Sequence, residues 1–210
     1  MSGKRIVGMI GALMAVLGSG QALANTRTGI SAYQRGDYAT ALREWEQGAR
    51  AGDPQALYNL GVAYAEGKAV PRDQARAVTY YQQGASKGSV LAAYNLGQAY
   101  RKGEGVGVDH AQAAKWYRYA ATRGHFRAAN ELGILYAEGK GVPRDPIEGF
   151  AWIYTATHVE IMDSQALNNA MQLARTFNSD QIKVAQTRGQ TYYQRYMAPN
   201  RATVRALMAR

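Results

Sequence analysis

Three nearly identical segments of seventeen residues constrain the fold of this chain more than any other feature. They read LYNLGVAYAEGKAVPRD at 57–73, AYNLGQAYRKGEGVGVD at 93–109 and ANELGILYAEGKGVPRD at 129–145, so each begins 36 residues after the one before it. Self-similarity at a period of 20 to 50 residues is typical of stacked-repeat proteins, whose units bury their apolar faces against their neighbours. The chain is therefore expected to be a tandem array of one structural unit.

Each unit contains two helical patterns joined by a glycine-rich loop. Apolar residues at helical spacing predict the buried stripe of the first helix; in the unit that starts at 53 they are Ala56, Leu60, Ala63 and Tyr64. Gly61 lies within this stripe and recurs as Gly97 and Gly133, although glycine inside a helix costs about 1 kcal/mol relative to alanine. The recurrence indicates that another helix crosses at these glycines, too close for a side chain.

Capping residues mark where the helices of each unit end and begin. Glycine favours the left-handed conformation of a helix C-cap, and it stands at the end of each first helix, at Gly67, Gly103 and Gly139. Aspartate is a preferred N-cap, and it opens each second helix, at Asp73, Asp109 and Asp145.

A shortened unit precedes the three long ones. Residues 33–52 match the later pattern with five loop residues missing, so Gly36 and Asp37 join the two helices directly. The step between this unit and the next is 31 residues on the first helix, which is near the 34-residue period of a tetratricopeptide hairpin.

The recurring residues resemble the Sel-1-like repeat (SLR), a family of the tetratricopeptide-like superfamily. The pattern A-x-Y-x-L-G-x-x-Y-x-x-G-x-G-V-x-x-D, then A-x-x-W-Y-x-x-A-A-x-x-G, is met most fully in the second unit, whereas the third has Glu160 in place of the closing glycine. The resemblance implies an all-α, right-handed solenoid of stacked antiparallel helix pairs. Its expected parts are a short hairpin at 25–52, repeats at 53–88, 89–124 and 125–160, a helical C-terminal cap at 161–198 and a basic tail at 199–210.

The first 24 residues predict a secretory signal peptide. Lys4 and Arg5 precede an apolar run over 6–17, and Ala22-Leu23-Ala24 supplies the small-residue cleavage pattern,. The run of 12 residues is shorter than the roughly 20 that a membrane helix needs, which disfavours an uncleaved anchor. Cleavage after Ala24 would leave a bacterial periplasmic or secreted chain without a transmembrane segment, and export makes nucleic acid a weak candidate partner.

No motif in the sequence supports catalysis, a cofactor or a metal. Ser86 lies in a G-x-S-x-G stretch, but a nucleophile elbow needs a preceding strand. Residues 133–140 resemble a phosphate loop, yet they have one intervening residue too many and lack the final Ser or Thr. His110, His125 and His158 show no ligand spacing, so we expect them to be solvated or to cap helices. Hydrolases among SLR proteins are disulfide-rich, and this chain has no cysteine.

The remaining surface predicts a protein-binding module. By resemblance to tetratricopeptide stacks, the first helices would line a concave groove that holds a protein or an extended peptide of the cell envelope. The residues expected to face it are Tyr58, Val62, Glu66, Tyr94, Gln98, Arg101, Lys102, Asn130, Ile134 and Glu138. Tyr and Arg are enriched in binding centres, but packing within the repeat is an equal alternative for Tyr58 and Tyr94. The resemblance implies an adaptor or a regulator of envelope signalling or assembly.

A second hypothesis assigns binding to the basic C-terminal quarter. Residues 161–210 carry seven Lys or Arg against two Asp. The candidate anion-binding residues are Lys183, Arg188, Arg195, Arg201 and Arg205. Attachment of these cations to an anionic envelope polymer or lipid surface would weaken with salt, because the Debye length falls from about 10 Å at 0.1 M to about 3 Å at 1 M.

Overall fold

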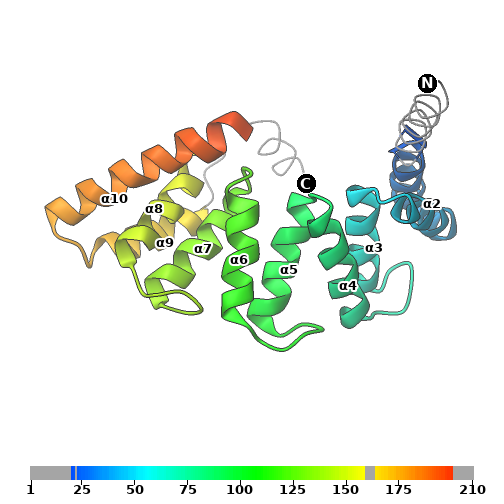
Figure 1. The fold of residues 1–210 in the computed structure, drawn as a ribbon, viewed down its shortest axis with the longest axis horizontal. Coiled ribbons are helices and arrows are strands. Elements are labelled where there is room, and N and C mark those ends of the chain that lie inside the picture. The colour runs from blue at the N-terminus through cyan, green and yellow to red at the C-terminus, as the bar shows by residue number, and fades with distance from the viewer. Residues whose placement is uncertain (1–19, 22, 159–163, 201–210) are drawn as a thin grey trace, which may run out of the picture. The chain divides into compact units, whose positions relative to one another are not determined.

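Helices make up all the regular structure in residues 20–21, 23–158 and 164–200, the parts of the chain that the computed structural model describes (Figure 1). The predicted all-helical fold of paired helices is thus confirmed. The chain divides into two compact units, the first ending at Ala92 and the second beginning at Ala93. None of the helices in the described ranges is long and apolar enough to cross a membrane.

The first unit contains a helical run over 23–34 and three further helices. These are α2 (Tyr38–Arg50), α3 (Pro54–Glu66) and α4 (Gln74–Ser86). In Figure 1 they are coloured from blue to blue-green, and α3 packs against both α2 and α4. In one core cluster of this unit, Trp45 and Leu60 are buried together with alanines. Leu57, Val78 and Tyr81 are also buried in the unit.

The second unit contains six helices among its described residues. They are α5 (Val90–Lys102, whose first turn precedes the boundary), α6 (His110–Ala121), α7 (Phe126–Glu138), α8 (Pro146–Thr157), α9 (Ser164–Ala174) and α10 (Ser179–Tyr192). α7 packs against α6, α8 and α9, and α10 lies along α8 (Figure 1). A π-helical turn (Tyr193–Met197) and a 3-10 turn (Ala198–Asn200) follow α10. Residues 159–163, with Glu160, and the tail beyond 200 lie outside the described residues.

The helix caps predicted from the sequence are confirmed. The carboxylate of Asp109 accepts a hydrogen bond of 2.9 Å from the backbone N–H of Gln112, and Asp73 and Asp145 cap α4 and α8 in the same way. The C-cap glycines Gly67, Gly103 and Gly139 have φ of 71°, 76° and 70°. Residues with a Cβ atom rarely adopt these backbone angles. Glycine is therefore needed where the chain turns between the helices of a pair.

The glycines inside the first helices are also explained by close approach. A Cβ atom on Gly61 would lie 2.4 Å from the Tyr81 ring, and one on Gly97 would lie 2.7 Å from the Tyr117 ring. In the third repeat, Gly133 instead faces the backbone, because its Cβ would lie 2.5 Å from the carbonyl oxygen of Gly149. The predicted tight crossings are confirmed, and in two of the three a tyrosine ring occupies the space that glycine leaves.

Candidate functional site

The predicted groove residues of the first unit lie on α3, and burial or contacts with neighbours leave them only partly available for binding a partner. Tyr58 is half-buried, and its ring centroid lies 6.3 Å from that of Tyr81. Val62 is half-buried. Glu66 is exposed, but its carboxylate lies 2.9 Å from the Lys68 ammonium. The contact of Tyr58 with Tyr81 favours the alternative in which this tyrosine belongs to the packing of the repeat.

Tyr94 and Gln98 of α5 are engaged inside the second unit. The Tyr94 ring stacks on His125 with a centroid separation of 4.2 Å, and its hydroxyl accepts a 2.6 Å hydrogen bond from the Gln98 amide. Burial, and then the nearby carboxylate of Glu131, raise the pKa of Tyr94 to about 12. These contacts indicate that Tyr94 holds α5 to the repeat and is not a free binding residue.

The other polar residues predicted on the first helices of the second unit also have partners within it. The Arg101 guanidinium lies 3.3 Å from the Glu131 carboxylate, and the buried Asn130 accepts a 3.0 Å hydrogen bond from Asn169 of α9. Lys102 and Glu138 are exposed, and each lies near a residue of opposite charge in the following loop. Most of the predicted groove therefore serves the fold.

Ile134 and Glu138 also line a groove of about 390 Å³ against α9. The opposite side of this groove is formed by Asn169, Gln172 and Leu173 of α9. The C-terminal helices thus cover part of the face that the sequence assigned to a partner.

The predicted anion-binding residues do not act as one set. Arg188 of α10 is half-buried, and it donates a 2.9 Å hydrogen bond to Glu148, so its charge is neutralised within the unit. Lys183 and Arg195 are exposed. Arg201 and Arg205 lie outside the described residues.

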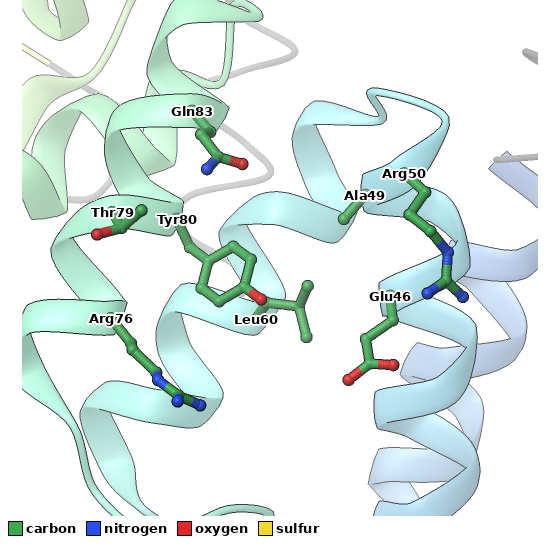
Figure 2. Close-up of a pocket in the computed structure, with 8 residues that line it drawn as sticks. All are labelled: Glu46, Ala49, Arg50, Leu60, Arg76, Thr79, Tyr80 and Gln83. Atoms are coloured by element: carbon green, nitrogen blue, oxygen red, sulfur yellow. The ribbon is translucent and has the colours of Figure 1, made fainter.

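A pocket of about 610 Å³ opens between α2 and α4 in the first unit, over Leu60 of α3 (Figure 2). Its side chains come from two pairs at i, i+4 spacing, which places each pair on one helix face. Glu46 and Arg50 form the pair on α2, and Arg76 and Tyr80 form the pair on α4. The pocket was not predicted from the sequence, because resemblance to tetratricopeptide stacks points to the first helices. The polar i, i+4 pairs on the second helices are the signal that could have located it.

Stacked aromatic rings shape the α4 wall of the pocket. The rings of Tyr64 and Tyr80 lie 5.5 Å apart and nearly parallel, at 14°. The Arg76 guanidinium lies 5.4 Å above the Tyr64 ring and donates a 3.3 Å hydrogen bond to its hydroxyl. Burial, then Tyr64 and Glu46, raise the pKa of Tyr80, so its hydroxyl stays protonated and can donate. This wall is therefore preorganised for a polar ligand.

The α2 wall carries two charged side chains, Glu46 and Arg50. Neither Glu46 nor Arg50 forms a hydrogen bond or an ion pair with another described residue. With Arg76 opposite, the pocket presents one carboxylate and two guanidinium groups around an apolar floor. Guanidinium groups bind carboxylates and a carboxylate binds ammonium or guanidinium, so the pocket suits a peptide that carries both signs of charge. In the described ranges, no cluster of three or more His, Asp or Glu could hold a metal.

Comparison with known proteins assigns the repeats. The family model described as Sel1 repeat matches residues 54–89, 90–125 and 127–157. No curated protein matches the chain. Among solved structures, a Sel1 repeat protein from Oxalobacter formigenes is 31% identical with a TM-score of 0.67, over 76% of this chain and 46% of that one.

A second solved structure covers more of the chain. It is c5321, described as a protective antigen present in uropathogenic Escherichia coli strains displaying an SLR fold. The two chains are 26% identical with a TM-score of 0.60, over 92% of this chain and 51% of c5321. This chain thus spans about half the length of each of these two proteins.

Proposed function

Because the chain is a Sel1-like repeat protein, we propose that it is an exported, non-catalytic module that binds a segment of a partner protein in the pocket between α2 and α4. Sel1 repeat proteins are in general protein-interaction modules. The observation that carries the proposal is the pocket of Figure 2, in which Glu46 and Arg50 face open space without a partner among the described residues.

The partner segment is expected to combine opposite charges with an apolar side chain. An acidic group would lie against Arg50 and Arg76, a basic group against Glu46, and the apolar group over Leu60. Tyr and Arg carry much of the energy at protein interfaces, and Tyr80, Arg50 and Arg76 provide both types here. The same walls offer no pairing of nucleophile and base, which supports a binding role over a catalytic one.

Export rests on the predicted signal peptide and is consistent with c5321, which is a protective antigen. A partner would then belong to the cell envelope, where the module could act as an adaptor in signalling or assembly. Oligomeric state does not enter the proposal, since all lining residues come from one chain.

The test compares capture of envelope proteins by three purified forms of residues 25–210. The double variant Glu46→Gln/Arg50→Gln removes both free charges with little change in shape. We expect affinity for the captured partner, remeasured with both proteins purified, to fall by about tenfold or more, since a charged contact contributes about 1.5–3 kcal/mol. Thermal melts should be unchanged, because neither side chain contacts a described neighbour through a hydrogen bond or ion pair.

The matched control is Arg43→Gln, on the same helix. Arg43 is exposed, with 62% of its side chain accessible, and it lies outside the pocket. Its substitution should leave capture intact. Equal capture by all three forms would contradict the assignment of the pocket, and a purified chain that turns over an envelope substrate would contradict the non-catalytic role.

A further inference from the structure

A groove of about 410 Å³ runs along the outer face of α6 in the second unit. Lys115, Trp116, Arg118 and Tyr119 of α6 line one side of it. The pairs three or four residues apart, Lys115–Arg118, Lys115–Tyr119 and Trp116–Tyr119, are neighbours on the helix surface. Gly141 and Val142, in the loop between α7 and α8, line the other side. Neither the repeat packing nor the function proposed above uses this groove.

The loop wall of the groove is held firmly in place. Gly141 has φ of 70°, in the region that favours glycine,. A Cβ atom there would lie 2.2 Å from the carbonyl carbon of His110. The loop backbone therefore lies directly against the start of α6, and the groove is preformed.

Cations around the groove rest on aromatic rings. The Arg123 guanidinium lies 3.8 Å from the centre of the Tyr119 ring, and that of Arg118 lies 5.6 Å from the Tyr136 ring, whose hydroxyl it also contacts. The Lys115 ammonium lies 5.4 Å from the Trp116 ring. Within the described parts of the chain, none of these three cations forms an ion pair.

The contacts between cations and rings lower the entropic cost of binding a ligand. A long cationic side chain loses rotamer freedom when it binds, and contact with a ring restricts Arg118 and Arg123 beforehand. Their guanidinium groups keep donors free for a carboxylate, which arginine binds in a bidentate manner. Trp116 and Tyr119 are half-buried, with ring centroids 6.0 Å apart, so part of each ring remains open as an apolar floor.

We propose that the α6 groove binds an acidic peptide segment in which carboxylates flank an aromatic or aliphatic side chain. Charge complementarity identifies the acidic part, because Lys115 and Arg118 line the groove and Arg123 borders it, whereas none of the described lining residues is acidic. The rings of Trp116 and Tyr119 identify the apolar part. A polyanion such as polyphosphate would bind most tightly to many cations in a row. Three cations around one aromatic floor instead match a short peptide that carries both carboxylates and an apolar side chain.

The test measures fluorescence anisotropy of a labelled peptide, DEFDEL, with blocked ends, mixed with residues 25–210 at low salt. We expect binding that weakens by about tenfold or more in Lys115→Gln/Arg118→Gln, because two charge-assisted contacts are removed. Trp116→Ala should weaken it too, and the peptide DEGDEG should bind less well than DEFDEL. Circular dichroism checks that each variant is folded, and Lys115→Gln alone serves if the double variant is not.

The matched control removes the same charge elsewhere in the unit. Lys183→Gln/Arg195→Gln changes two exposed cations of the C-terminal helices, and DEFDEL should still bind. The proposal would be overturned if both double variants lost binding equally, or if DEFDEL did not bind the unmodified chain. Binding of polyphosphate that does not depend on Trp116 would overturn it as well. If DEFDEL binding is lost in Glu46→Gln/Arg50→Gln and kept in Lys115→Gln/Arg118→Gln, the peptide binds the pocket of the first unit and the proposal for the α6 groove is overturned.

Discussion

His125 is a buried histidine that caps α7. Its Nδ1 accepts a 3.1 Å hydrogen bond from the backbone N–H of Ala128, which requires an unprotonated Nδ1. Burial, and then the charge of Arg127, lower the pKa of His125 to about 3. The capping role expected for the histidines is confirmed here, and it depends on the neutral ring.

We predict from this residue that acid destabilises the second unit. An unfolded histidine titrates near pH 6.5, whereas His125 in the folded state stays neutral down to about pH 3. The unfolded state therefore binds the extra proton in this range, and the free energy of unfolding should fall by about 1.4 kcal/mol per pH unit below pH 6. His125→Asn keeps a capping acceptor without the titration.

Urea unfolding at pH 7, 6 and 5 measures the effect. The loss of stability on acidification should be smaller in His125→Asn than in the unmodified chain, even if the variant is less stable at pH 7. Identical losses in the two proteins would show that the ring of His125 is accessible to protons in the folded state.

One carboxylate, that of Glu148, connects α8 with α10 through several hydrogen bonds. Glu148, in the first turn of α8, accepts hydrogen bonds of 2.8 Å from Trp152 of its own helix, 2.9 Å from Arg188 and 2.9 Å from Tyr192 of α10. The rings of Trp152 and Tyr192 lie 4.6 Å apart. Burial and the hydrogen bond to Glu148 raise the pKa of Tyr192. These contacts add polar bonds to the packing of α10 along α8.

Substituting Glu148 should loosen α10 selectively. Glu148→Gln keeps the shape but removes the charge that neutralises Arg188, so we expect a loss of about 1.5–3 kcal/mol. Hydrogen exchange should accelerate over 179–192 before it does in α6 or α7. The matched variant Glu138→Gln removes an exposed acid that pairs with Lys140, and it should change stability by less than about 1 kcal/mol. Uniform acceleration of exchange throughout the second unit would contradict a local role.

At the scale of the whole molecule, processing has to spare Asn25 and Thr26, which connect the first helical run to the rest of the first unit. Asn25 donates a 3.1 Å hydrogen bond to Gln47, and Thr26 donates to the buried carboxylate of Asp53, the N-cap of α3. The predicted cleavage after Ala24 keeps both residues. Removal of the leader would lower the formal net charge from +10 to +8, because it takes away only Lys4 and Arg5.

We therefore predict that the mature protein begins at Asn25. Intact-mass measurement of the chain recovered from the envelope fraction should match residues 25–210. A chain that retains Met1 would contradict export by a cleaved signal. A chain that begins beyond Thr26 would contradict the role of the Thr26–Asp53 contact, because α3 would then lose support for its cap.

Features set by neighbours in sequence were predictable, and features set between distant residues were not. The caps at Asp109 and Gly103 follow from hydrogen bonds within a few residues, so residue type and spacing reveal them. The pairing of Arg188 with Glu148 joins residues 40 apart, and its existence depends on how α10 lies on α8. The two polar i, i+4 pairs that line the pocket of Figure 2 are visible in the sequence, but the approach of α2 to α4 that brings them together is not.

Each hairpin carries its own start and stop chemistry. Asp109 opens α6, and Gly103 closes the helix before it, with no help from outside the pair. A duplicated or deleted block of 36 residues would therefore bring or remove a self-contained module and leave the junctions chemically the same. In-frame gene duplication therefore provides a way to lengthen such an array without new capping chemistry.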